Sequence, residues 1–188
     1  MIYILTGPIR TGKTSALLTW CNNRNDVDGV LCPDDENGKR YFLNIKSNEK
    51  HLLEAEEDAI HENDITSVGR FHFFKKSFDL ANEYLVGLKD EVSFSYLIID
   101  ELGKLELQNQ GLHFSAKKLI QCYMLHKHQH LILVVRESLI DAILKQPNNI
   151  VQELLTYNVI LTPHIAGYSY RAIEKMSAEL LAQLRDIL

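Results

Sequence analysis

The segment GPIRTGKT, at residues 7–14, contains the residue types that proteins use to hold phosphate groups. Gly7, Gly12, Lys13 and Thr14 have the spacing G-x-x-x-x-G-K-[ST] between an apolar segment and a predicted helix. The glycines let the backbone fold closely around phosphates, so that amide N–H groups and a helix N-terminus point inward. The Lys13 ammonium can neutralise the β- and γ-phosphates, and the Thr14 hydroxyl can bind Mg²⁺. The spacing therefore predicts a phosphate loop.

The contacts to the nucleotide are expected to be spread along the whole loop. Consecutive amide N–H groups point toward the phosphates in such a loop, and Lys13 adds a charge that also serves catalysis. The residues expected to contact the nucleotide are Gly7, Pro8, Ile9, Arg10, Thr11, Gly12, Lys13, Thr14 and Ser15. The ligand implied is ATP or GTP with Mg²⁺.

A second segment, YLIIDELGKLEL at residues 96–107, ends a strongly apolar run in two adjacent carboxylates. Residues 97–99 have the continuous apolar character of a strand that is buried on both faces. Two adjacent carboxylates are costly to bury unless a positive group lies near them. Because the chain also has a phosphate loop, Mg²⁺ is the expected positive group. Asp100 is predicted to hold the metal beside Thr14, and Glu101 to orient and polarise the attacking water.

Arginines elsewhere in the chain are candidates for contacts with the nucleotide. Arg136 follows the apolar segment LILVV, so it is expected at the carboxyl end of a strand, where nucleotide sites lie in such sheets. There it either contacts the γ-phosphate as a catalytic residue or forms a salt bridge with Glu137 or another surface acid. Arg40 and Arg70 fall in predicted inserted strands. They either line the substrate side or belong to a solvated hairpin face.

Alternating strand and helix patterns are needed to position these residues. Short apolar or β-branched runs predict strands at residues 2–6, 28–32, 39–45, 51–56, 67–74, 96–100, 130–136 and 158–162. Helices are predicted at residues 13–21, 78–88, 112–126 and 139–145, with a closing helix that carries Ile173, Leu180, Leu184 and Ile187. A polar turn with Asn37-Gly38 joins two of these strands as a hairpin. The sequence therefore predicts an α/β fold with three layers, a mainly parallel sheet and an inserted antiparallel hairpin.

The composition is that of an ordinary globular protein and excludes several function classes. Of the 188 residues 46% are hydrophobic and 24% charged, and no linker divides the chain, so a single domain at residues 1–188 is expected. The net charge of −5 gives no indication of a nucleic-acid or anionic-membrane partner. Three widely spaced cysteines indicate a reduced environment. With no signal-peptide core and no membrane-length apolar run, we expect a cytoplasmic enzyme.

Four segments, taken in order, resemble the small P-loop nucleoside-triphosphatase family that was first described from thermophiles and that includes the cancer-related nucleoside triphosphatase. They are GPIRTGKT, GVLCPDDENGKRYFLNI, VGRFHFF and IIDELGKLELQNQGL. The string DELGKLEL is close to the D-E-I-G-x-x-E-L signature of that family. Within this string, Lys104 and Glu106 either support the catalytic residues or shape the turn after the strand. The resemblance spans nearly the whole chain and thins after about residue 145.

This resemblance implies a compact three-layer P-loop NTPase fold with a hairpin inserted after the first helix. It also implies slow hydrolysis of ATP, GTP and other nucleoside triphosphates with Mg²⁺ and a loose base preference. One position departs from the family pattern, because Ile9 and Arg10 replace the usual Pro-Gly pair in the loop. Arg10 either points into solvent or lies over the γ-phosphate as an internal arginine finger. The departure bears on the rate of hydrolysis.

Two other function classes use the same loop. A nucleoside or small-molecule kinase needs an acceptor pocket, which the insertion at residues 28–74 could form. Kinases usually close an arginine-rich lid, however, and residues 137–170 contain no arginine. A nucleotide-dependent binding switch specific for guanine needs an N/T-K-x-D motif, which the sequence lacks. The predicted function is therefore hydrolysis of a nucleoside triphosphate to the diphosphate and phosphate, with kinase or switch activity as the alternatives.

Overall fold

The computed structural model describes residues 2–56, 64–91, 93–123, 128–140 and 159–162. The predicted closing helix lies outside these residues. Most of the helix predicted at residues 139–145 lies outside them as well.

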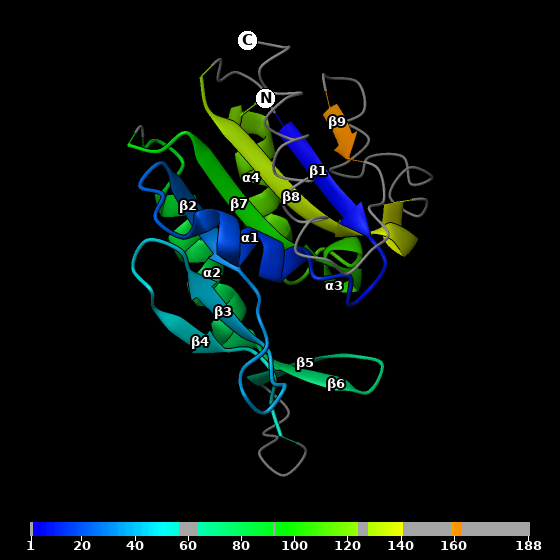
Figure 1. The fold of residues 1–188 in the computed structure, drawn as a ribbon. Coiled ribbons are helices and arrows are strands. Elements are labelled where there is room, and N and C mark those ends of the chain that lie inside the picture. Colours follow the sequence, from blue (N-terminus) through cyan, green and yellow to red (C-terminus); the bar gives the residue numbers. More distant parts are fainter. Residues whose placement is uncertain (1, 57–63, 92, 124–127, 141–158, 163–188) are drawn as a thin grey trace.

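Within the described residues, a seven-stranded sheet forms the centre of the molecule (Figure 1). Its strands are β1 (Ile2–Gly7), β2 (Val27–Leu31), β3 (Tyr41–Asn44), β4 (Lys50–Leu52), β7 (Tyr96–Leu102), β8 (His130–Arg136) and β9 (Val159–Thr162). Their order across the sheet is β4-β3-β2-β7-β8-β1-β9. The strands from β2 to β9 in this order pair in parallel, whereas β3 and β4 form antiparallel pairs beside β2. The predicted mainly parallel sheet is confirmed.

Helices cover both faces of the sheet and give the three layers that the sequence predicts (Figure 1). One face packs against α1 (Lys13–Cys21), whose buried Leu17 joins a cluster with Ile98 and Val134. The other face packs against α2 (Lys75–Gly87) and α4 (His113–Tyr123). A short helix, α3 (Lys104–Leu107), follows β7. In the part of the chain that the structure describes, no helix combines the length and apolar character needed to cross a membrane.

The chain between β2 and α2 contains two antiparallel hairpins. The first is formed by β3 and β4 and extends the main sheet. The second is a separate two-stranded sheet of β5 (Ile65–Val68) and β6 (Phe71–Phe74), which lies at the bottom of the molecule in Figure 1. The sequence predicted one extended run at residues 67–74, but Gly69 turns the chain back. Its φ of 61° is left-handed, a conformation that glycine adopts without steric cost.

The strand order brings distant segments of the chain to one edge of the sheet. β8 lies between β1, which leads into the phosphate loop, and β7, which ends in the two acids. The carboxyl ends of parallel strands share one edge, where ligands of such sheets bind. In the pairing of β1 with β8, Gly7 lies opposite Arg136. The ends of β1, β8 and β7 therefore form the floor of a common site.

Gly29 in β2 allows a close approach to the central strand β7. Its φ of 124° belongs to a region that residues with a side chain rarely adopt. A Cβ atom at this position would lie 2.1 Å from the carbonyl oxygen of Ile98. Because the obstructing atom belongs to the backbone of β7, no side-chain rotation could relieve the clash.

Gly29→Ala is expected to lower the free energy of unfolding by at least about 2 kcal/mol, because backbone strain and a backbone clash act together. Gly87→Ala is the matched control, since Gly87 ends α2 and a Cβ there meets nothing within 4 Å outside its own helix backbone. That variant should gain about 0.4–1 kcal/mol. Urea unfolding followed by circular dichroism measures both. Parental stability of Gly29→Ala would contradict the requirement for glycine at this contact.

Candidate functional site

The phosphate loop joins the end of β1 to the start of α1, where the sequence places it. Gly12 is the N-cap of α1 and has a left-handed φ of 78°, which glycine adopts readily. Pro8, Ile9 and Arg10 are exposed at the tip of the loop. Arg10 also has a left-handed φ, of 62°. This strained backbone gives a physical reason for the glycine that the resembling family usually has in this part of the loop.

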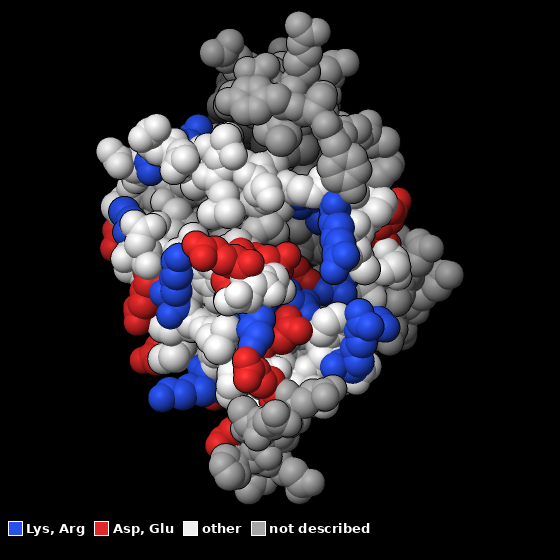
Figure 2. All heavy atoms as spheres, turned by 60° about the horizontal axis from the view of Figure 1, so that its bottom comes forward, with Lys and Arg blue, Asp and Glu red and all other residues white. Residues whose placement is uncertain are grey.

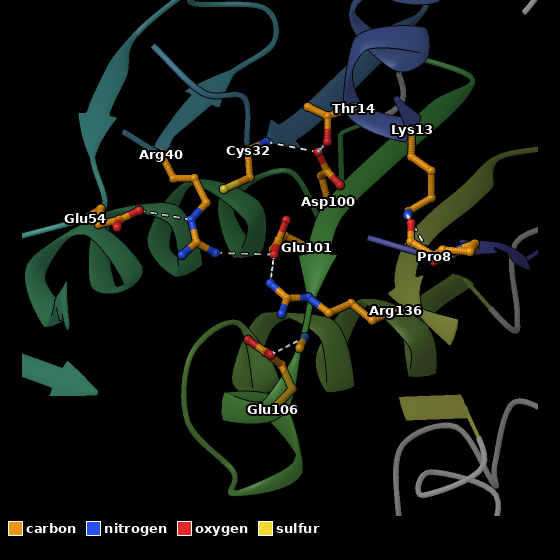
Figure 3. A network of polar contacts seen from close by, with 12 residues as sticks. Pro8, Lys13, Thr14, Cys32, Arg40, Glu54, Asp100, Glu101, Glu106 and Arg136 are labelled. Atoms are coloured by element: carbon orange, nitrogen blue, oxygen red, sulfur yellow. Dashed lines mark hydrogen bonds and ion pairs between the residues drawn. The ribbon is translucent and has the colours of Figure 1, made fainter. Parts of the chain in front are cut away.

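Lys13 folds back over the loop that precedes it. Its Nζ donates hydrogen bonds to the carbonyl oxygens of Gly7, at 3.1 Å, and Pro8, at 2.8 Å (Figure 3). It also donates to Oγ1 of Thr11, at 3.3 Å. Burial lowers the pKa of the Lys13 ammonium, and the nearby Asp100 opposes this shift. Phosphate oxygens can replace these carbonyl oxygens as acceptors, which would leave the ammonium satisfied in both states.

Asp100 lies at the end of β7 and is only 1% exposed. Its Oδ2 accepts a hydrogen bond of 2.8 Å from the Thr14 hydroxyl and one of 3.1 Å from the N–H of Cys32 (Figure 3). Burial raises the pKa of the Asp100 carboxyl, although both hydrogen bonds and Lys13 act in the opposite direction. A buried carboxylate with a raised pKa gains from a nearby cation. The sequence predicts that Thr14 and Asp100 meet at the metal. In the structure they are in contact through the hydrogen bond from the Thr14 hydroxyl to Asp100.

Glu101 turns away from Asp100, although the two residues are adjacent. Ile98 packs on the α1 face and Ile99 on the opposite face, so alternation along the strand sends Asp100 toward α1. Glu101 has a left-handed φ of 67°, and the register of β7 with β8 shifts between Ile99 and Leu102. Such an irregularity re-aims a side chain at a strand end. The two adjacent carboxylates therefore lie in different environments, that of Asp100 beside Thr14 and that of Glu101 beside Arg136.

Two arginines bind the Glu101 carboxylate. Arg136 at the end of β8 donates a hydrogen bond to Oε1 of Glu101 (Figure 3). Nη1 of Arg40 lies 3.5 Å from the same oxygen. Burial, and then the positive charge of Arg40, lower the pKa of the Arg136 guanidinium. Arg136 thus forms a salt bridge with Glu101 and not with Glu137, while its expected contact with the γ-phosphate stays a prediction.

Arg40 belongs to this site and not to a solvated hairpin face. Its side chain is 15% exposed and its Nε donates to Oε2 of Glu54 at 3.2 Å. The guanidinium lies 4.8 Å from the ring centroids of both Phe71 and Phe73 in β6. Arg40 therefore connects both inserted hairpins to Glu101. In the pairing that follows β2, Arg40 lies opposite Asp34, just beyond the end of that strand.

Glu106 has a structural position in the turn after β7. Its two carboxylate oxygens accept backbone N–H groups of Gly103, at 2.6 Å, and Leu112, at 2.7 Å. Burial raises its pKa, and these hydrogen bonds oppose the shift. Of the two expectations for Glu106, these contacts match the shaping of the turn. Lys104 is exposed in the same turn.

The oxygen atoms around Thr14 suit a hard divalent cation. Mg²⁺ is usually bound by one or two carboxylates or hydroxyls together with phosphate oxygens and water. The Thr14 hydroxyl and the Asp100 carboxylate supply such a pair, 2.8 Å apart and beside the loop. Cys32 contributes its backbone N–H to Asp100, a contact that no side-chain pattern could reveal in the sequence. Within the described residues, no group of three or more His, Cys, Asp or Glu side chains is arranged to hold a metal ion.

Comparisons with known proteins agree with the fold and with the family that the sequence resembles. The model of the NTPase family matches residues 2–165 of the chain. A crystal structure of THEP1 from the hyperthermophile Aquifex aeolicus has a TM-score of 0.59 at 15% identity, over 94% of this chain and 96% of that chain. A solution structure of a human cancer-related nucleoside triphosphatase has a TM-score of 0.64 at 16% identity, over 96% and 97%. No curated protein sequence matches the chain. The resemblance seen in the four segments is confirmed.

The burial of Asp100 predicts a conflict between stability and metal binding. Because the pKa of Asp100 is raised by folding, its charge destabilises the folded state above that pKa. This cost disappears as the pH falls to the unfolded value of about 3.9. Without Mg²⁺ and nucleotide, Asp100→Asn should therefore gain about 0.5–2 kcal/mol of unfolding free energy near pH 7. The gain should shrink toward pH 4.

Urea titrations at these two pH values test this expectation. Asp79→Asn is the control, because Asp79 is exposed on α2 and its substitution should leave the free energy of unfolding nearly unchanged. If Asp100→Asn is less stable than the parent near pH 7, the carboxylate stabilises the fold and the conflict does not exist.

Proposed function

The chain belongs to the NTPase family, and from this premise we propose that it hydrolyses nucleoside triphosphates to the diphosphate and phosphate. We include in this proposal a dependence on Mg²⁺ and weak discrimination between bases. The observation that carries it is the hydrogen bond of 2.8 Å between Thr14 and Asp100. This bond joins the phosphate loop to the end of β7 across 86 positions of the sequence. It brings together the two parts that a Mg²⁺-triphosphate site requires.

The loop residues bind and orient the triphosphate in this proposal. Backbone N–H groups between Gly7 and Ser15 surround the phosphates, and Lys13 exchanges its loop carbonyl acceptors for β- and γ-phosphate oxygens. Thr14 and Asp100 would hold Mg²⁺, which when bound neutralises charge on the phosphate oxygens. Arg10, exposed at the tip of the loop, is close in sequence to these groups and can add a positive charge on the solvent side.

Glu101 is the proposed acceptor of the proton from the attacking water. In the structure its carboxylate is bound by Arg136 and Arg40, and ion pairing makes a carboxylate a weaker base. In this proposal the γ-phosphate binds beside the end of β8, where Arg136 can donate hydrogen bonds to it as well as to Glu101. When Arg136 divides its donors between that phosphate and Glu101, the carboxylate regains basicity and the guanidinium stabilises the charge that leaves with the diphosphate. Substrate binding and activation of the base are thereby coupled.

Weak base discrimination is supported by the sequence, which has no N/T-K-x-D motif for guanine. The contacts described above all lie at the phosphate end of the nucleotide, which every nucleoside triphosphate shares. A base acceptor such as Glu101 at this end also favours hydrolysis over a pure binding switch. The cytoplasmic location, the single domain and the absence of a nucleic-acid partner stay predictions from composition.

Phosphate release is expected from ATP, GTP, CTP and UTP with Mg²⁺, and very little when EDTA replaces the metal. The rates for the four bases should agree within about a hundredfold, or about 2.7 kcal/mol. Lys13→Ala should abolish turnover, because the ammonium serves the phosphates, while Lys76→Ala on the exposed side of α2 should keep it. A single strongly preferred base would contradict weak discrimination. Parental turnover of Lys13→Ala would show that this loop is not the site.

The two adjacent carboxylates are expected to respond differently to removal of their charge. Glu101→Gln should lower single-turnover hydrolysis by about 10²- to 10⁴-fold, the usual contribution of a positioned base. It should change the affinity for a nonhydrolysable triphosphate with Mg²⁺ only slightly. Asp100→Asn should weaken both Mg²⁺-dependent binding and turnover. Because both variants keep the side-chain shape, each serves as the control for the other.

The outcomes separate the two roles. Normal turnover of Glu101→Gln together with failure of Asp100→Asn would assign the base to another group. Glu106 is a poor replacement, since both its oxygens accept backbone N–H groups. Normal turnover of both variants would remove both carboxylates from the mechanism.

A further inference from the structure

Contacts from both inserted hairpins fix the position of the Arg40 guanidinium. Its Nε donates a hydrogen bond of 3.2 Å to Oε2 of Glu54, which lies just beyond β4. The guanidinium lies over the rings of Phe71 and Phe73 in β6, 4.8 Å from each centroid, where the ring faces attract a cation. The carbonyl oxygen of Arg40 accepts the N–H groups of Leu53 and Glu54, at 3.0 and 3.3 Å. Both the backbone and the side chain of Arg40 are thus held in place.

The Glu101 carboxylate lies at an irregular strand end, where packing constrains it little. Its backbone is left-handed, and the register of β7 with β8 shifts between Ile99 and Leu102. Its side chain is 28% exposed, whereas the neighbouring Asp100 is fully buried. A base is effective when its oxygen is held close to the reacting water. The charged partners of Glu101 therefore have to supply much of its orientation.

The two arginines that bind Glu101 reach it from different parts of the fold. Figure 3 shows Arg40 approaching from the side of Glu54, and Arg136 approaching from the other side. In the pairing of β8 with β1, Arg136 lies opposite Gly7, the first residue of the phosphate loop, so it is placed to turn to a γ-phosphate. Nη1 of Arg40 lies 3.5 Å from Oε1 of Glu101, while its Nε is bound by Glu54. When a phosphate draws donors of Arg136 away, Arg40 remains beside the carboxylate.

The surface around these hairpins carries charges of both signs. Figure 2, in which this side of the molecule comes forward, shows Lys and Arg side chains lying beside Asp and Glu side chains. Opposite charges that lie close together largely cancel at a distance, and salt screens the remainder. The position of the Glu101 carboxylate therefore depends on its direct partners and not on a general field of the protein.

We propose that Arg40 is a positioning residue for the base: it holds Glu101 toward the attacking water while Arg136 binds the γ-phosphate, and it thereby makes hydrolysis depend on the inserted hairpins. The water oxygen bonds to the γ-phosphorus as the bond from that phosphorus to the β–γ bridging oxygen breaks, and the water proton passes to Glu101. Arg40 itself contacts neither the nucleotide nor the reacting atoms. The inference rests on the proposed function, because it assigns a role within that reaction.

Arg40→Ala is expected to lower kcat for hydrolysis of ATP with Mg²⁺ about ten- to hundredfold and to leave KM within about twofold of the parental value. The carboxylate loses its fixed partner, and a misplacement of about 1 Å can cost about a hundredfold in rate. Loss of a cation also makes Glu101 a stronger base, but water screens this effect because both side chains are partly exposed. Arg40→Lys should recover part of the rate, since an ammonium can bind Glu101 but lacks the planar fork that also reaches Glu54.

Glu54→Gln tests the same link without changing Arg40 or Glu101. It weakens a charge-assisted hydrogen bond to Nε of Arg40 and should lower kcat about two- to fivefold at unchanged KM. Arg70→Ala is the matched control, because Arg70 is exposed and its guanidinium lies 5.2 Å from the centroid of the Phe71 ring. It removes an arginine from the same ring that Arg40 contacts and should keep the parental kcat. Circular dichroism of each variant confirms that it is folded.

A double-mutant cycle shows whether Arg40 acts through Glu101. Arg40→Ala is combined with Glu101→Gln, and single-turnover hydrolysis is measured for the parent, both single variants and the double variant. If Arg40 serves to position the base, its removal should change the rate less than about twofold once the base is gone, so that the two losses do not add. A general loosening of the fold would instead lower the rate by the same factor in both backgrounds.

The possible results distinguish this inference from the proposed function. Parental kcat in Arg40→Ala overturns the positioning role and leaves hydrolysis standing. A raised KM at unchanged kcat places Arg40 on the nucleotide and overturns the role as well, as does an equal loss in both backgrounds of the cycle. If the parent protein releases no phosphate from any nucleotide, the proposed function fails and this inference fails with it. A loss of kcat at constant KM that requires Glu101 and is absent in Arg70→Ala supports the positioning role.

Discussion

The arrangement of the site depends on the contact between Thr14 and Asp100. The two residues come from opposite halves of the described chain, and their hydrogen bond holds the start of α1 against the end of β7. The contact is possible because β8 lies between β1 and β7, so that the loop bridges one intervening strand to reach the acid. The Cys32 N–H at the end of β2 fixes the same carboxylate oxygen from the other side. The start of α1 and the end of β2 are thus both bound to one buried atom of β7, Oδ2 of Asp100.

Burial makes this arrangement costly for a protein without a cation. The Asp100 pKa is raised despite two hydrogen bonds, because burial disfavours the charged form of this carboxyl. Glu101 adds a second cost through its left-handed backbone. Strain and buried charge at adjacent residues are typical of sites whose geometry serves a ligand rather than the free protein. They also explain why the strand ends in two carboxylates, since each turns to a different face of the sheet.

The insertion between β2 and α2 acts on this site from outside the parallel sheet. Arg40 lies directly before β3 of the first hairpin, is covered by the rings of Phe71 and Phe73 from the second, and reaches Glu101. Any ligand that displaces these rings would also displace the guanidinium, and with it one partner of the Glu101 carboxylate. The insertion is therefore in physical contact with the catalytic group that we propose, and it can adjust the basicity of that group through Arg40.

The sequence by itself determined the phosphate loop, the strand β7 that carries Asp100 and Glu101, and the three-layer architecture. Each of these depends on the spacing of residues that are close together in the chain. Glycine and lysine positions define the turn between β1 and α1, and continuous apolar runs define strands buried on both faces. It also determined the antiparallel pairing of β2 with β3, from the turn with Asn37-Gly38. Local spacing missed the tight turn at Gly69 and the short helix α3, where single residues rather than periodicity set the backbone.

Only the tertiary structure decided what each charged side chain contacts. The sequence left Arg136 between a phosphate contact and a surface salt bridge, Arg40 between the substrate side and solvent, and Glu106 between catalysis and the turn. The pairing of β1, β8 and β7 brings Arg136 to Glu101, and the hairpin register brings Arg40 to the same carboxylate. In the turn after β7, both carboxylate oxygens of Glu106 accept hydrogen bonds from backbone N–H groups. These contacts join residues tens of positions apart, or depend on where a backbone N–H points, and neither is encoded in the spacing of residue types along the chain.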